Sequence, residues 1–140
     1  MRAIRKLGWV APEEFTVKAA DGSTDLWGVL YKPYDFDPKK KYPVIEYIYD
    51  GPQISMVPHT LRFMEGSRQA NLNMALPHLG YIVVIVDARG TPERSKEFQD
   101  VTYGEWGEHV ADDHADGRQV RSRPVGRGGR LTAPGTPRAA

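Results

Sequence analysis

Near the start of the sequence, apolar and polar residues alternate in two short runs. Glu14–Ala19 reads EFTVKA and Leu26–Tyr31 reads LWGVLY. Between them stand Asp21, Gly22 and Ser23, residue types that favour tight turns. The pattern therefore predicts a β-hairpin as the first element of the fold.

Two later runs are apolar enough to be buried strands. Pro43–Tyr49 (PVIEYIY) predicts a central strand, with its proline at the first position, where a missing N–H does least harm. Ile82–Val86 (IVVIV) is an unbroken β-branched run, the clearest strand of the chain. Such a run indicates burial on both faces, as in a parallel sheet whose strands are connected by helices.

Helical spacing of apolar residues precedes the second of these strands, at Leu72, Ala75, Leu76 and Leu79. Pro77 should kink or shorten the last turn of this helix, and Gly80 is a plausible stop. An acidic helix is expected over about Glu105–Val120, with Gly117 weakening its end. Strand, helix and strand in succession predict the α/β class with right-handed crossovers.

Composition supports one ordinary globular domain, since 140 residues with 40% apolar content can form a core. The absence of cysteine excludes disulfides and thiolate zinc sites and leaves the redox compartment undetermined. With no apolar run of signal-peptide or membrane-span length, we expect a soluble chain of undetermined localisation.

Charge is divided by position, although the formal net charge is only +1. Residues 117–140 hold six arginines and no acid, so that residues 1–116 carry a net charge of −5. Beyond Pro124 the sequence reads VGRGGRLTAPGTPRAA, where only Val125 and Leu131 would bury much surface. We expect a lead-in segment (1–11), a folded unit (12–124) and a disordered tail (125–140).

Functional groups in open α/β sheets gather beyond the carboxyl ends of the strands. Tyr49, Asp50 and Gly51 follow one predicted strand, and Asp87, Arg89 and Gly90 follow the other. A tyrosine held by a tight turn can donate to a developing oxyanion, although spacing alone favours a tyrosine that packs at the rim. For Asp87 and Arg89, a structural ion pair is favoured over binding of a substrate carboxylate.

The acidic helix invites a metal-site hypothesis, because its carboxylates accompany His109 and His114. The acids are Glu105, Glu108, Asp112, Asp113 and Asp116. No partner cluster stands elsewhere in the sequence, so a solvated helix face is favoured and no metal or other cofactor is expected.

A nucleophilic triad is not expected in this chain. An α/β enzyme of that kind needs a serine in a G-x-S-x-G turn, followed by an acid and then a histidine. No such motif surrounds any serine, namely Ser23, Ser55, Ser67, Ser95 or Ser122, and no histidine follows His114.

Three segments together resemble the first part of the catalytic domain of prolyl oligopeptidase family serine peptidases, nearest to the dipeptidyl peptidase IV-like branch. They are PEEFTVKAADGSTDLWGVLYKPYDFDPKKKYPVIEYIYDGP, GYIVVIVDARGTPERSKEFQD and YGEWGEHVADD. The resemblance covers about Pro12–Pro124, and Tyr-x-Gly-Pro followed by Asp-x-Arg-Gly-Thr-Pro at this separation is quite specific.

The resemblance implies an α/β-hydrolase domain that follows a β-propeller and cleaves peptides, commonly after proline, with a Ser-Asp-His triad. It makes Tyr49 an oxyanion-hole donor, with Asp50, Gly51 and Pro52 completing its turn. Asp87, Arg89 and Gly90 match the Asp-x-Arg-Gly motif and are expected to be framework residues near the site.

Several positions depart from that family pattern. Glu93 and Ser95 stand where glycines are usual, so this loop is expected to adopt positive φ less easily. His114 and Asp116 replace expected apolar residues. After Pro124 the nucleophile strand and its turn are replaced by Arg, Gly, Pro and Ala, which suggests a shifted reading frame or a native low-complexity tail.

The sequence is compatible with three functions. The favoured one is a peptidase-derived segment without propeller or triad, inactive alone, whose exposed sheet edge promotes self-association. The second is a non-catalytic binding or assembly module that pairs with another hydrolase chain. Nucleic-acid binding by the arginine-rich tail is disfavoured because the tail lacks aromatic residues for stacking.

Overall fold

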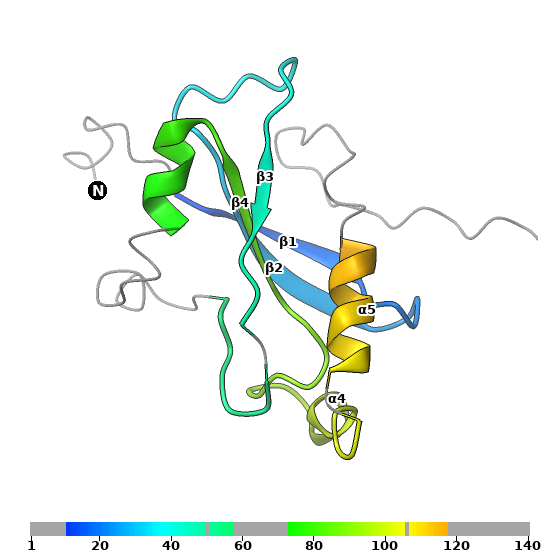
Figure 1. The fold of residues 1–140 in the computed structure, drawn as a ribbon. Coiled ribbons are helices and arrows are strands. Elements are labelled where there is room, and N and C mark those ends of the chain that lie inside the picture. Colours follow the sequence, from blue (N-terminus) through cyan, green and yellow to red (C-terminus); the bar gives the residue numbers. More distant parts are fainter. Residues whose placement is uncertain (1–10, 50, 58–72, 106, 118–140) are drawn as a thin grey trace, which may run out of the picture.

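A computed structural model describes residues 11–49, 51–57, 73–105 and 107–117 (Figure 1). Strands β1 (Glu13–Lys18) and β2 (Asp25–Tyr31) pair antiparallel, which confirms the predicted hairpin. Asp21 closes the turn between them, because its carboxylate accepts the Ser23 N–H at 2.7 Å, the Thr24 N–H at 2.8 Å and the Thr24 hydroxyl at 2.6 Å.

The sheet is mixed, in the order β1-β2-β4-β3. Strand β4 (Ile82–Asp87) pairs antiparallel with β2 and parallel with β3 (Val44–Glu46). All six residues of β4 are buried, as the β-branched run predicts. Strand β4 therefore lies between strands on both sides and forms the centre of the described sheet.

The prediction of a central strand over Pro43–Tyr49 is wrong in length, because strand β3 covers only three residues. Among the described residues β3 pairs with β4 alone and is the last strand of the sheet, so its central position stays a prediction. The Tyr47 N–H still bonds to the Val84 carbonyl at 2.9 Å. Ile48 and Tyr49, which follow, are at least half exposed.

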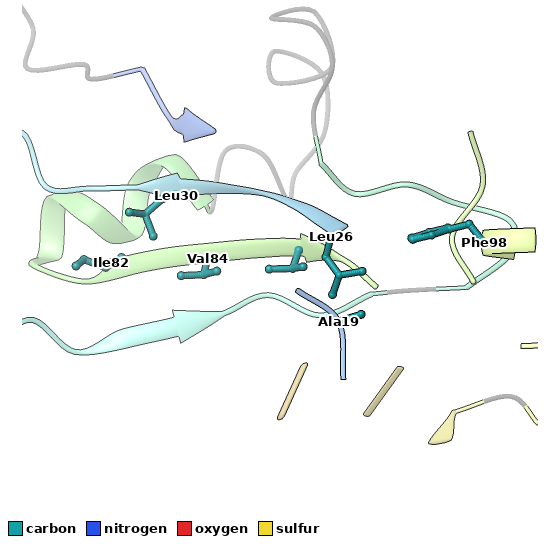
Figure 2. Packing of buried hydrophobic residues seen from close by; sticks show 7 residues of the cluster. Ala19, Leu26, Leu30, Ile82, Val84 and Phe98 are labelled. Atoms are coloured by element: carbon teal, nitrogen blue, oxygen red, sulfur yellow. The ribbon is translucent and has the colours of Figure 1, made fainter. Parts of the chain in front are cut away.

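Both faces of the sheet carry apolar clusters, because successive side chains of a strand point to opposite faces. One cluster comprises Ala19, Leu26, Leu30, Ile82, Val84, Val86 and Phe98. Figure 2 shows Leu30 of β2 beside Ile82 and Val84 of β4, with Phe98 beyond the far end of these strands. The other cluster comprises Val29, Tyr31, Met56, Val57, Val83 and Ile85.

The helix before β4 ends as predicted. Residues 73–75 are α-helical and continue into the 3-10 turn η1 (Leu76–Leu79), within which Pro77 lies. Gly80 ends it in the left-handed conformation, with φ 88° and its N–H donating to the Pro77 carbonyl at 3.0 Å. Leu72 lies outside the described residues.

Two helices follow β4 in the chain, near its carboxyl end (Figure 1). Helix α4 (Lys96–Asp100) begins after Ser95, whose hydroxyl accepts the Phe98 N–H at 3.1 Å. Helix α5 (Glu108–Gly117) begins three residues later than predicted. The described residues therefore combine a mixed sheet with few helices, as in part of an α/β fold.

Several predictions fall outside the described residues. They concern residues 1–10, the end of the acidic helix beyond residue 117 and the tail (125–140). Residues 58–72 are also outside, so the handedness of the β3-to-β4 crossover stays a prediction. Within the described part of the chain, no helix has the length and apolarity to cross a membrane.

Candidate active site

The carboxyl ends of β3 and β4 lie at the same end of the sheet, because the two strands are parallel. Tyr49 follows β3 and exposes 56% of its surface. Arg89 and Gly90 follow β4, and Asp87 is its last residue. The structure thus brings the two predicted groups to one end of the sheet, while Asp50 lies outside the described residues.

Asp87 holds the turn that follows Tyr49. Its buried carboxylate accepts the Ser55 hydroxyl at 2.5 Å, the Met56 N–H at 2.7 Å and the Val57 N–H at 3.1 Å. These bonds cross from β4 to the loop over 30–32 residues of sequence. Asp87 therefore fixes the loop 55–57 through three hydrogen bonds.

Arg89 forms the predicted structural ion pair, with partners on two other segments. Its guanidinium donates to Asp113 of α5, with Nε to Oδ2 at 3.0 Å and Nη2 to Oδ1 at 2.9 Å. Its Nη1 also lies 3.2 Å from Oδ2 of Asp21 in the hairpin turn. Hydrogen bonding to Asp113 raises the pKa of Arg89, so its guanidinium keeps its positive charge at neutral pH.

Asp113 joins three segments of the chain. Besides the guanidinium, its carboxylate accepts the backbone N–H of Arg89 at 3.0 Å and that of Ala20 at 2.9 Å. Its side chain has no exposed surface. The hairpin turn, the end of β4 and α5 are therefore fastened at one buried carboxylate.

The interpretation of the acidic helix as a solvated face is wrong for Asp113 and His114. Both are buried, because α5 packs them against the sheet ends, and Nδ1 of His114 lies 2.8 Å from Oε1 of Glu46 in β3. His109 and Glu105 form an exposed contact at 3.5 Å. Among the described residues, no group of three or more potential ligands could hold a metal ion.

The loop after β4 departs from expectation at Glu93. This residue adopts φ 69°, the conformation that a non-glycine residue was expected to resist, at a cost of about 1–2 kcal/mol. Ser95 has φ −75° and caps α4, so it needs no glycine. Gly90 has φ 99°, and a Cβ there would lie 2.2 Å from Cγ2 of Thr102. The loop therefore carries backbone strain at Glu93 and leaves no room for a side chain at Gly90.

The electrostatics of the hairpin turn favour a charged Asp21. Burial alone would raise the pKa of Asp21, but hydrogen bonds from Thr24 and Ser23 outweigh this effect. With the nearby charge of Arg89, they hold that pKa well below its usual range. The negative charge of Asp21 that Arg89 contacts is therefore present at any ordinary pH.

Sequence reasoning missed two side chains that support the turn after Tyr49. Gln99 of α4 donates from Nε2 to the Pro52 carbonyl at 2.9 Å, and the Ser55 hydroxyl donates to Asp87. Neither belongs to a local motif, and their partners are 47 and 32 residues away. The predicted turn indicated that the Pro52 carbonyl needs a hydrogen-bond donor. It did not indicate that Gln99 is that donor.

Comparisons with known proteins show the family of the chain. Residues 68–123 match the model of the prolyl oligopeptidase family. Dipeptidyl peptidase 8 of Mus musculus and that of Homo sapiens are each 38% identical over 111 residues, which is 79% of this chain. The chain spans only 12% of the length of these curated relatives.

A solved structure shares the fold of most of the chain. A protein from Bacteroides ovatus ATCC 8483, described as a dipeptidyl aminopeptidase IV, is 37% identical with a TM-score of 0.70. The match covers 79% of this chain and 15% of that one. Together with the two dipeptidyl peptidases, it identifies the chain as a member of the prolyl oligopeptidase family.

Proposed function

We propose that the chain is the oxyanion-side segment of an α/β-hydrolase domain in a serine peptidase. The observation that supports this most is that the segment after Tyr49 is hydrogen-bonded to Asp87 at the end of β4 and to Gln99 of α4. The chain is also 38% identical to dipeptidyl peptidase 8. In the proposal, residues 12–124 are an incomplete hydrolase domain and 125–140 are a tail outside it.

Tyr49 has the chemical role in this proposal. Its half-exposed phenol donates a hydrogen bond to the oxygen that becomes negative when a peptide carbonyl is attacked. Asp50, Gly51 and Pro52 shape the turn that carries it. Loss of one such donor typically lowers the rate of the chemical step by about 10²–10³.

Asp87, Arg89 and Gly90 act through the framework. Asp87 holds the loop 55–57, and Arg89 ties the end of β4 to α5. Gly90 allows the close approach of the Thr102 side chain. These residues keep the end of the sheet in one arrangement, and we assign them no contact with substrate.

The polypeptide of 140 residues does not hydrolyse peptides by itself in this proposal. It contains no G-x-S-x-G motif, and no histidine follows the last acidic residue, Asp116. The substrate of the complete catalytic unit is a peptide from which a dipeptide is released, as the names of the relatives indicate. A nucleophile, acid and base must come from residues that the 140 do not include.

A chimera tests the role of Tyr49. The aligned segment of human dipeptidyl peptidase 8 is replaced by that of this chain, and hydrolysis of a Gly-Pro chromogenic substrate is measured. The chimera should hydrolyse the substrate, and Tyr49→Phe within it should lower kcat about 10²-fold with little change in KM. The 140-residue chain alone should show no hydrolysis above background.

Tyr103→Phe in the same chimera is the matched control, because that tyrosine is almost fully exposed and lies after α4. It should leave kcat unchanged. Equal activity of the Tyr49→Phe and Tyr103→Phe chimeras, both folded by circular dichroism, would refute the oxyanion role. Hydrolysis by the isolated chain would refute the proposed inactivity.

A further inference from the structure

We propose that Gln99 is a positioning residue for Tyr49, an inference that rests on the proposed function. Gln99 lies on α4, which follows β4, whereas Tyr49 follows β3. Its side-chain amide reaches the backbone of the turn that carries Tyr49. Different contacts hold the chain before and after that tyrosine.

The chain before Tyr49 is fixed by β4. The Tyr47 N–H donates to the Val84 carbonyl at 2.9 Å, one residue beyond the last paired residue of β3. Tyr47 also packs against the apolar cluster that includes Val83 and Ile85. The backbone is therefore anchored two residues before Tyr49.

The chain after Tyr49 is fixed by two different side chains. Gln99 Nε2 donates to the Pro52 carbonyl, three residues beyond Tyr49, and Asp87 accepts from the loop 55–57. Between them the Ile54 N–H closes the turn onto the Gly51 carbonyl at 3.3 Å. Of the two side chains, Gln99 acts closer to Tyr49 along the chain.

Helix α4 can serve as a fixed base for Gln99. The Ser95 hydroxyl caps its first turn, and the Gln99 N–H donates to the Ser95 carbonyl at 3.2 Å. Phe98, the preceding residue, is buried in the core cluster shown in Figure 2. The Gln99 amide therefore reaches the turn from a helix that the core holds in place, and the direction of Tyr49 depends on it.

Isosteric substitution separates this role from general packing. Gln99→Glu has the same shape but cannot donate to the Pro52 carbonyl, whereas Gln99→Lys retains a donor. Gln53→Glu, in the exposed turn itself, is the control for the added charge. The 140-residue chain is labelled with 3-fluorotyrosine, and the Tyr49 ¹⁹F signal is assigned by its loss in Tyr49→Phe.

In Gln99→Glu we expect the Tyr49 signal to move toward its value in the urea-unfolded chain. The Ile54 amide should exchange with solvent roughly tenfold faster, while the Tyr31 signal and the urea midpoint stay unchanged. Gln99→Lys should keep the Tyr49 signal and the Ile54 exchange rate at their values in the parent chain. Gln53→Glu should also leave both unchanged. Asp87→Asn should accelerate exchange at Met56 and Val57, if it folds.

An unchanged Tyr49 signal, with Ile54 exchange within twofold of the parent, in folded Gln99→Glu would overturn the proposal. So would the same shift in Gln53→Glu, which would assign the effect to charge. Gln99→Glu removes one hydrogen bond at a solvent-accessible site, so the chain should still fold even if Asp87→Asn does not. These results do not depend on whether Tyr49 stabilises an oxyanion, which the chimera tests separately.

Discussion

Arg89→Met and Asp113→Asn, made singly and together, test whether a buried ion pair fastens α5 to the end of β4. The two side chains are 11% and 0% exposed. Two short hydrogen bonds join them, from Nε of Arg89 to Oδ2 of Asp113 at 3.0 Å and from Nη2 to Oδ1 at 2.9 Å. Methionine keeps much of the length of arginine. Asparagine keeps one acceptor oxygen, enough for only one of the two backbone N–H groups, because Ala20 donates to Oδ1 and Arg89 to Oδ2 of Asp113.

The expected costs follow from the burial. Removing one partner of a buried pair leaves an uncompensated charge and typically costs about 3–5 kcal/mol. Arg89→Met should lower the free energy of unfolding by about 3 kcal/mol, because two backbone N–H groups still donate hydrogen bonds to Asp113. Asp113→Asn should cost about 2–4 kcal/mol. In the double variant neither residue 89 nor residue 113 is charged, so its cost should fall about 2 kcal/mol short of the sum.

Urea unfolding followed by tryptophan fluorescence gives the four free energies of unfolding. Lys96 and Asp100 supply the control cycle, since they form an i, i+4 pair whose side chains are 86% and 52% exposed. Lys96→Met with Asp100→Asn should show a coupling of about 0.3–0.5 kcal/mol. Added salt should reduce the exposed coupling more than the buried one.

A coupling between Arg89 and Asp113 no larger than the exposed control would refute this reasoning. It would mean that the pair, although buried, is solvated by other means. A single variant that lowers the free energy of unfolding by less than about 1 kcal/mol would have the same meaning, because an unpaired buried charge destabilises a protein by more than that.

Two further predictions concern the turns near this pair. Gly90→Ala should lower the free energy of unfolding by about 2–4 kcal/mol, since φ is 99° and the new Cβ meets Thr102 at 2.2 Å. Gly22→Ala, at φ 70° with open space around it, should cost only the backbone strain of about 1 kcal/mol, and equal costs for the two would contradict the clash. Because the pKa of Asp21 is lower in the folded chain than in the unfolded one, its stabilisation is complete above about pH 5 and is lost as pH falls toward and below 2. Asp21→Asn should therefore be about 1–2 kcal/mol less stable at pH 7, with a gap that narrows on acidification; a constant gap in urea titrations at pH 7, 4 and 2.5 would contradict the assignment.

Local signals were sufficient for the hairpin, for β4 and for the stop at Gly80. Each depends on neighbouring residues, such as the Asp21 turn or the β-branched run. The length of β3 was not predictable in this way, because the number of its residues that pair is decided by β4, some 38 residues away. An apolar run such as PVIEYIY does not show where its partner strand ends.

The candidate site was predictable in position but not in its connections. Asp87 is the last residue of β4 and Tyr49 follows the end of β3 by three residues, and parallel pairing brings these two strand ends together. The partners of Asp113 are 24 and 93 residues away, so the helix pattern alone showed an acidic face and not a buried one. Glu93 adopts positive φ, a conformation that its residue type did not predict.

Strand β4 is apolar toward both faces of the sheet, which has a consequence for its alignment. In most strands a slip of one residue exposes apolar side chains to water, and this penalty fixes the register. In β4 such a slip would exchange one apolar side chain for another, at Ile82, Val83, Val84, Ile85 and Val86.

The polar residues at the end of β4 remove this ambiguity. A shifted strand would withdraw Asp87 from the loop 55–57 and Arg89 from Asp113, leaving buried charges without their partners. The residues that organise the candidate site therefore also select the single alignment in which the sheet assembles.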